Sequence, residues 1–156
     1  VAQGFDVSSY YEFQKDAQDP RAAFIVNGID LQDRLGDFGS VGGGAAGLEL
    51  DWVDTKLGTP WHALRIASSV EHSNYVVLVP EEIYSASPNM SGRDSDKVRA
   101  DIVFFETPGG GAVFSTGSIS WAGSLAHDGY DNNVSRMTEN VLRRFIDPTP
   151  FAMPEG

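Results

Sequence analysis

The segment from Ala100 to Asp147 constrains the fold more than any other part of the chain. Residues 102–105 form a short apolar run of β-branched and aromatic side chains, which predicts a buried strand. Pro108 and the three glycines after it favour a chain reversal before a second strand at 112–115. Apolar residues at helical spacing then predict a closing helix, with members Val134, Met137, Val141, Leu142 and Phe145.

The ends of this predicted helix carry suitable polar residues. Residues 131–133 (Asp-Asn-Asn) are candidates for the N-cap, and Arg143 and Arg144 lie where a helix C-terminus favours positive charge. The loop before the helix, 117–130, is rich in Gly, Ser, Trp, His and Asp, and α/β proteins usually keep their chemistry in such loops. We expect this loop to form a wall of the site.

The rest of the chain adds further strands and little helix. Ser8, Ser9 and Glu12 form a capping-box pattern that predicts a short helix from about residue 9, ended by Pro20. The prediction therefore totals roughly five strands. It contains few helices for a complete α/β domain, in which strands and helices usually alternate. The other predicted elements are strands at 22–26, 48–52, 63–68 and 75–79 and irregular loops at 29–47 and 80–96.

Composition narrows the class of protein. A chain of 156 residues with 41% hydrophobic and 21% charged residues is typical of one soluble domain, and its net charge of −11 argues against nucleic acid and anionic membrane surfaces as partners. Without cysteine, the chain has no disulfide, no thiolate nucleophile and no Cys-based metal site. It also has no apolar run near the ~20 residues of a membrane span and no signal-peptide pattern, so we expect a cytoplasmic protein. Because the chain begins at Val1 and not at Met, we expect a processed chain or a piece of a longer one.

Two kinds of catalytic constellation can be drawn from the residue types. A serine hydrolase would use Ser118 or Ser124 with His127 and Asp128 or Asp131, although the G-x-S-x-G nucleophile pattern is absent. A metal site could use His62, Glu71 and His72, a set of two histidines and one carboxylate. Tyrosines could serve as phenolate ligands or as packing residues, with candidates Tyr75, Tyr84 and Tyr130.

Glu49 belongs to a carboxylate group with Asp51 and Asp54. It follows a glycine-rich turn and lies between Leu48 and Leu50, so in a strand its side chain faces opposite to two apolar neighbours. A carboxylate at such a strand start is either solvated or directed into a cleft.

Three segments of the chain closely resemble a known enzyme family. They read G-G-G-A-A-G-L-E-L-D, L-G-T-P-W-H-A-L-R-I-A-S-S and G-G-G-A-V-F-S-T-G-S-I-S-W-A-G-S-L-A-H-D-G-Y-D-N-N-V-S-R-M-T-E-N-V-L-R-R-F. Together they resemble the C-terminal part of the N,N-dimethylformamidase large subunit, from about Phe38 to Phe151. The resemblance implies a class I glutamine amidotransferase or trehalose-utilisation type of domain. We therefore expect an α/β fold, a partial flavodoxin-like (class I glutamine amidotransferase-like) open sheet with a C-terminal helix. Residues 1–156 would be a single C-terminal piece of a larger amidohydrolase domain, with 148–156 as a tail.

The resemblance also implies a reaction and a site. The family is an amidohydrolase that splits N,N-dimethylformamide or similar small formamides into formate and an amine. Its site resembles a mononuclear Fe³⁺ centre held by two tyrosines and one glutamate, with a lysine nearby. Glu49 matches the glutamate, as metal ligand and catalytic residue, and Lys97 is the best match for the lysine, which would stabilise the oxyanion or orient the substrate.

The two ligand tyrosines of the family lie further upstream than the residues available before Glu49, so Tyr10 and Tyr11 do not match them. We therefore expect the remainder of the large subunit to supply the tyrosines, with a small second subunit and an oligomeric assembly as further partners. Trp121 and Phe114 are candidates for aromatic contact with the substrate. The alternatives are a flavodoxin-like binding or scaffold domain without catalysis, and a metal-independent serine amidase that uses Ser118 and His127.

Overall fold

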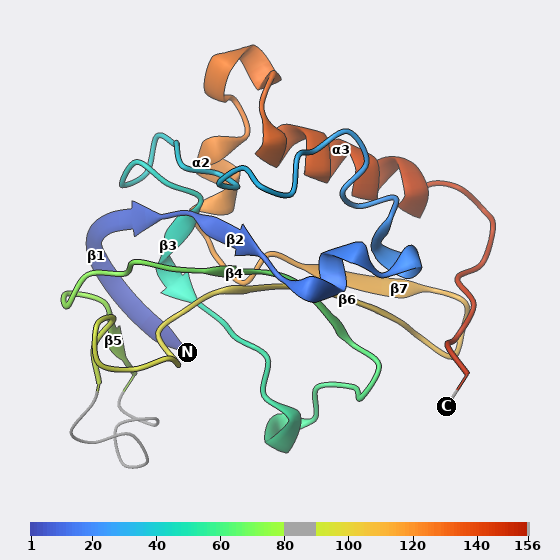
Figure 1. Cartoon of the computed structure of the whole chain (residues 1–156), viewed down its shortest axis with the longest axis horizontal. Helices are drawn as coiled ribbons and strands as arrows, with labels where there is room; N and C mark the ends of the chain where they lie inside the picture. The colour runs from blue at the N-terminus through green and yellow to red at the C-terminus, as the bar shows by residue number, and fades with distance from the viewer. Residues whose placement is uncertain (80–89, 156) are drawn as a thin grey trace.

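Two antiparallel sheets form the framework of the protein. The computed structural model describes residues 1–79 and 90–155, without the side chains of residues 5 and 6. Across those residues (Figure 1) the first sheet has the order β3-β1-β5 and the second the order β2-β4-β6-β7. The first comprises β1 (Ala2–Ser9), β3 (Ala46–Leu50) and β5 (Val77–Leu78), and the second β2 (Tyr11–Phe13), β4 (Leu64–Ser69), β6 (Asp101–Glu106) and β7 (Ala112–Ser115).

One long helix, α3 (Asn133–Phe145), lies across the four-stranded sheet (Figure 1). It buries Val134, Met137 and Val141 in the same core as Ile102 and Phe104 of β6, because these three residues recur on one face of the helix. The remaining helical elements are short: η1 (Lys15–Gln18), η2 (Pro20–Ala22), η3 (Thr55–Leu57), α2 (Trp121–Ser124) and η4 (His127–Tyr130). No helix among the described residues combines the length and the hydropathy needed to cross a membrane.

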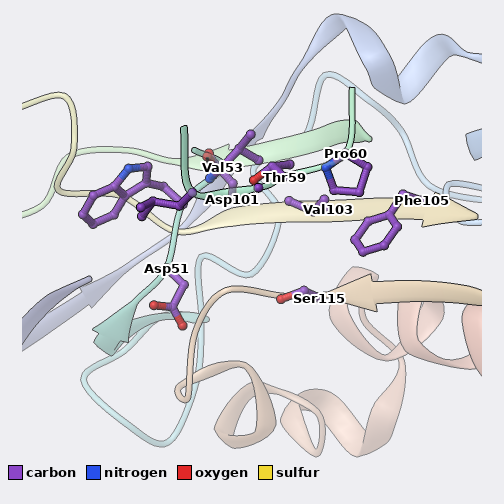
Figure 2. A pocket seen from close by; sticks show the side chains of 11 residues that line it. Asp51, Val53, Thr59, Pro60, Asp101, Val103, Phe105 and Ser115 are labelled. Atoms are coloured by element: carbon purple, nitrogen blue, oxygen red, sulfur yellow. Dashed lines mark hydrogen bonds between the residues drawn. The ribbon is translucent and has the colours of Figure 1, made fainter. Parts of the chain in front are cut away.

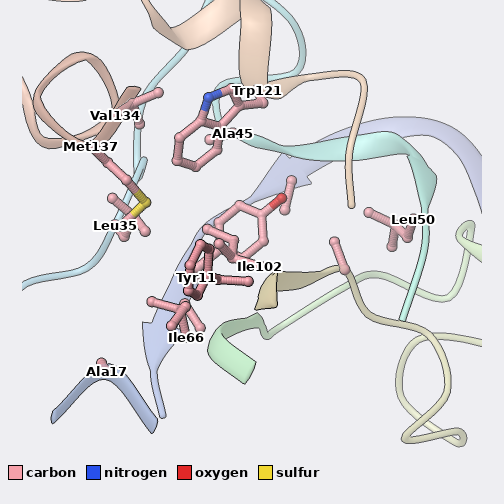
Figure 3. Close-up of a cluster of buried hydrophobic side chains, with 14 of the residues drawn as sticks. Tyr11, Ala17, Leu35, Ala45, Leu50, Ile66, Ile102, Trp121, Val134 and Met137 are labelled. Atoms are coloured by element: carbon pink, nitrogen blue, oxygen red, sulfur yellow. The ribbon is translucent and has the colours of Figure 1, made fainter. Parts of the chain in front are cut away.

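The core is organised around Tyr11, the first residue of β2. Its side chain is fully buried, its hydroxyl donates to the Thr116 carbonyl at 2.9 Å, and its ring meets the Trp121 ring edge-on at 5.9 Å. Figure 3 shows Tyr11 in the middle of the cluster, between Trp121 and the sheet residues Ile66 and Ile102. Burial raises the pKa of the Tyr11 phenol, so Tyr11 is a neutral packing residue.

Several predicted elements are confirmed. β7 has the predicted bounds, β6 and α3 extend the predicted runs by a residue or two, and Asn132 caps α3 by accepting from the Ser135 N–H at 2.8 Å. β3 and β4 lie close to the predicted strands 48–52 and 63–68, whereas β5 keeps only two residues of the predicted 75–79. The predicted loop at 80–96 lies partly outside the described residues.

Two predictions near the N-terminus are wrong. The predicted helix from residue 9 is instead the end of β1, β2 and η1, because Tyr11 and Phe13 pair with Ser69 and Ala67 of β4. The predicted strand at 22–26 consists of turns that follow η2, where Asp19 accepts from the Arg21 N–H and Pro20 begins the turn. Tertiary packing overrides the local pattern in both places.

The fold class is α/β in the coarse sense, but the expected flavodoxin-like sheet is wrong. Every strand pair in the described part of the chain is antiparallel. A flavodoxin-like sheet is parallel and needs crossover helices between successive strands, whereas β6 and β7 are joined by a tight glycine turn. The strand–turn–strand unit that was predicted correctly is thus an antiparallel hairpin.

Substitution of Gly117 tests the close contact between this residue and the backbone at Asp51 and Asp101, where the two sheets meet. Gly117 has a left-handed φ of +67°, and a Cβ there would lie 2.6 Å from the Asp51 carbonyl and 2.8 Å from the Asp101 carbonyl. We predict that Gly117→Ala lowers the free energy of unfolding by about 2 kcal/mol more than Gly43→Ala does, as measured by urea denaturation. Gly43 is the matched control, because its φ of +84° imposes similar backbone strain while no atom lies within 4 Å of its Cβ position. Equal losses in the two variants would contradict this account.

Candidate functional site

The C-terminal end of β3 presents two carboxylates. Leu48 has a left-handed φ of 65°, Glu49 after it is half-buried opposite Gln3 of β1, and Asp51 is exposed. Strand alternation puts Glu49 and Asp51 on the side opposite to the buried Leu50. Within the described residues, neither carboxylate takes part in a hydrogen bond or a salt bridge, so both are available to a group outside this part of the chain.

The end of β3 is fixed by backbone hydrogen bonds to two other segments. The Asp51 N–H donates to the Gly117 carbonyl, and the Asp51 carbonyl accepts from the Asp101 N–H, both at 2.8 Å. At the start of the strand, the Ser118 hydroxyl accepts from the Gly47 N–H at 2.8 Å and donates to the Gly47 carbonyl at 2.9 Å. The segment 117–118 therefore holds β3 at both ends.

The buried carboxylate of Asp101 binds the segment that follows β3. Asp101 is 1% exposed and accepts hydrogen bonds from the Ser68 hydroxyl at 2.6 Å, from the Val53 N–H at 2.8 Å and from Arg99 Nε at 3.0 Å. The Arg99 guanidinium supplies the opposite charge that an ionised carboxylate needs away from water.

A cavity of about 310 Å³ lies next to the end of β3, over the face of the four-stranded sheet that turns away from α3. Figure 2 shows Val103 and Phe105 of β6 and Ser115 of β7 along the cavity, Thr59 and Pro60 above them, and Asp51 apart at its edge. The floor is mainly apolar with a few polar groups, and the size suits a small molecule.

Neither of the predicted site residues Glu49 and Lys97 lines this cavity. Lys97 is half-buried in the turns before β6, where its backbone N–H donates to the Ser95 hydroxyl at 3.3 Å. Lys97 lies four residues before Asp101, which bonds to Asp51, so both predicted residues belong to segments that meet at the end of β3. The structure does not pair their side chains, and their catalytic roles remain predictions.

The serine-based constellation is not assembled. The Ser118 hydroxyl is engaged with the Gly47 backbone, and the buried Ser124 donates to the Phe38 carbonyl at 2.7 Å. His127 is exposed and stacks on Phe38, with 4.2 Å between ring centroids. The start of the loop 117–130 holds β3, and none of its residues lines the cavity beside β3, so its role as a wall of the site stays a prediction.

The histidine-based metal site is not assembled either. His62 and His72 lie before and after β4, whose six residues separate them by roughly 20 Å. His62 Nε2 bonds to the Glu106 carbonyl at 3.0 Å, and His72 Nε2 bonds to the Ser69 hydroxyl at 2.6 Å. Among residues 1–79 and 90–155, no three His, Asp or Glu side chains are grouped so that they could hold a metal ion.

The predicted aromatic residues have other roles. Trp121 is buried and donates from Nε1 to the Thr138 hydroxyl at 3.1 Å, and the partly buried Phe114 packs against the core, so their contact with substrate stays a prediction. Tyr75 and Tyr130 are exposed, and Tyr84 lies outside the described residues.

The sequence reasoning missed the ion pair between Arg99 and Asp101. Its signal was an acidic residue directly before an apolar strand with an arginine two positions earlier. A charge at the edge of a buried strand needs a partner, and the nearby arginine was the candidate.

The comparisons with known proteins agree with one family. Residues 1–134 match the family model described as N,N-dimethylformamidase beta subunit-like, C-terminal. The N,N-dimethylformamidase beta subunit of Paracoccus aminophilus is 53% identical over 147 residues, which are 94% of this chain and 19% of that protein. The corresponding protein of Alcaligenes sp is 52% identical over the same length and shares of each chain.

The chain is thus an α/β domain built on two antiparallel sheets. It belongs to the N,N-dimethylformamidase beta subunit-like, C-terminal family. The expected assignment to the large subunit is corrected, because the matched family and both relatives are described as beta subunits. The chain spans about a fifth of the length of these relatives.

The Asp101 network predicts a difference between two aspartates that are close in space. We predict that Asp101→Asn lowers the free energy of unfolding by about 3 kcal/mol, because it leaves Arg99 without its counter-charge in a buried site. Asp51→Asn, the matched control on an exposed side chain, should change it by less than about 0.5 kcal/mol. Urea denaturation at neutral pH measures both, and a loss below 1 kcal/mol for Asp101→Asn would contradict the assigned role.

His72 predicts a pH-dependent stability. It is 3% exposed, its Nε2 is hydrogen-bonded to the Ser69 hydroxyl at 2.6 Å, and burial lowers the pKa of His72 to about 4. The unfolded state, with a pKa near 6.5, then binds the proton first, so this contribution to stability is present above pH 6.5 and is lost as the pH falls toward 4.

Urea denaturation at pH 7.5 and pH 4.5 measures this contribution. The chain should lose about 2.5 kcal/mol more between these two values than the His72→Gln variant, in which the amide oxygen can still accept from Ser69. Equal pH dependence of the two proteins would show that His72 is not buried in its neutral form.

Proposed function

We propose that this chain is the part of a small-formamide hydrolase that supplies Glu49 to the active site, and that N,N-dimethylformamide is the substrate. The family and the names of the two relatives support the reaction. The observation that carries the role of this chain is the Glu49 carboxylate, which is half-buried and has no polar partner in the described residues.

Partial burial of a carboxylate is costly unless a charge or hydrogen-bond donor compensates it. The other buried carboxylates of the protein follow this rule, since Asp101 pairs with Arg99 and Glu106 with Arg21 at 2.9 Å. Glu49 departs from it, while its position on a strand clamped at both ends gives it a fixed location. Its partner is therefore expected from outside the described residues, and in this proposal it comes from the rest of the beta subunit.

The described residues bring no three His, Asp or Glu side chains together that could hold a metal ion, so in this proposal the iron site needs further ligands. In this proposal Glu49 is one donor to a mononuclear Fe³⁺, and two tyrosines from the rest of the beta subunit complete the set. Lys97 is proposed to face the substrate from the segment before β6. Assembly with a second subunit and into an oligomer, and a cytoplasmic location, belong to the same proposal.

The proposal is tested in the complete beta subunit by Glu49→Gln. We expect the variant to lose iron and dimethylformamide hydrolysis together, because an amide is a much weaker ligand than a carboxylate for a hard trivalent cation. Iron content, visible tyrosinate-to-iron absorbance and formate release measure the effect. Glu12→Gln, on an exposed residue of β2, is the matched control and should keep both iron and activity.

Two results would count against this function. A Glu49→Gln subunit that retains iron would remove Glu49 from the site, and a pure 156-residue chain that binds stoichiometric iron would contradict a site shared with other residues. A complete beta subunit without iron or activity would instead favour a binding or scaffold domain.

A further inference from the structure

The outer side of α3 carries an apolar groove that the fold of this chain leaves open. It has a volume of about 430 Å³ and runs between α3 and the loop before it; we call it the α3 groove. Leu142, Ile146 and Tyr130 on its sides are 58%, 79% and 67% exposed. The residues that line it are Leu125, Tyr130, Ser135, Thr138, Glu139, Leu142, Arg143 and Ile146. A group of large apolar side chains around one groove is typical of a surface that another protein segment covers.

The loop before α3 adds to this surface. Asp128, Gly129 and Tyr130 have left-handed φ values of 49°, 64° and 74° in succession. Such a backbone is unfavourable for Tyr, whereas Gly and Asp adopt it more readily. It nevertheless places an exposed tyrosine, a residue type enriched at protein interfaces, at the rim of the groove.

The charge of the groove differs from that of the chain. The chain has a net charge of −11, whereas α3 carries Arg136, Arg143 and Arg144 against the single acid Glu139. Arg143 forms a salt bridge to Glu139 at 2.7 Å and remains largely exposed at the rim of the groove. Among the residues that line the groove only Glu139 and Arg143 are charged, and they neutralise each other, so an apolar segment matches the groove itself. The remaining positive charge of α3, on Arg136 and Arg144, lies outside the lining and favours an acidic flank on that segment.

We propose that the α3 groove is the docking site for another part of the same beta subunit, an amphipathic segment whose apolar side chains cover Leu142 and Ile146. The matched region is 19% of each relative, so about four fifths of each relative lies outside it and could supply such a segment. The groove follows α3 from Ser135 to Ile146, a distance of roughly 16 Å, which suits about three turns of helix. A second copy of the chain would bring a further net charge of −11 to the surface, which makes it a poorer match.

Photo-crosslinking in the complete, active dimethylformamidase identifies the occupant. Leu142 is replaced by the photoreactive residue benzoylphenylalanine, and the crosslinked peptides are identified by mass spectrometry. We expect a crosslink to beta-subunit residues that lie outside these 156, within one beta subunit. A crosslink to the same helix of a second copy, a crosslink to a different subunit, or no crosslink would each overturn the proposal.

A second measurement uses Leu142→Glu. In the complete beta subunit we expect the melting temperature to fall by about 3 °C or more, because the carboxylate is buried in the interface. In the 156-residue chain the same exposed position should change the melting temperature by less than about 1 °C. Leu142→Met is the matched control and should leave both unchanged, whereas an equal shift in the two contexts would overturn the proposal. The inference rests on the family assignment alone, so its outcome is independent of whether Glu49 binds iron.

Discussion

The buried Asp101 carboxylate is the interaction on which the arrangement of the two sheets depends. Through it, β4 contributes the Ser68 hydroxyl, the segment after β3 contributes the Val53 N–H, and Arg99 contributes the compensating charge. An ionised carboxylate can stay buried only while these donors are present, and the donors in turn lose a partner if Asp101 moves. The Asp101 side chain thus holds the segment after β3, while backbone hydrogen bonds to Gly117 and Asp101 hold the end of β3 itself.

The opposite end of β6 also carries a buried carboxylate that is paired with an arginine. Glu106 is buried and pairs with Arg21, whose guanidinium also donates to the His62 carbonyl at 3.0 Å. This network joins η2 to the segment before β4, far from the carboxylates of β3. β6 therefore begins and ends with a paired carboxylate, and Ile102 and Phe104 between them lie in the core. Buried pairs of this kind are weak as net stabilisers, but losing one partner is costly.

Two features of the described residues offer contacts to a further protein segment. Glu49 is a half-buried carboxylate without a partner in the described residues, and the α3 groove exposes apolar side chains that water solvates poorly. They lie on different elements, β3 and α3, so the rest of a beta subunit would have to contact the domain in two places. The proposed catalytic role and the proposed docking surface therefore rest on separate observations. Both proposals concern a chain that spans about a fifth of its relatives.

The sequence by itself determined those secondary-structure elements that short-range sequence patterns specify. β7 and α3 follow from a glycine turn, apolar periodicity and the Asn132 cap. The unusual sequence of segments such as G-L-E-L-D pointed to N,N-dimethylformamidase but to the wrong subunit. Tertiary structure decided the direction of strand pairing, the strand at Tyr11 and the partners of every candidate serine and histidine. Hydrogen bonds such as that between Ser124 and the Phe38 carbonyl join residues far apart in the chain, and residue spacing carries no information about them. Whether a carboxylate is paired, as Asp101 is, or left open, as Glu49 is, depends on which segments pack beside it, and only the folded chain brings those segments together.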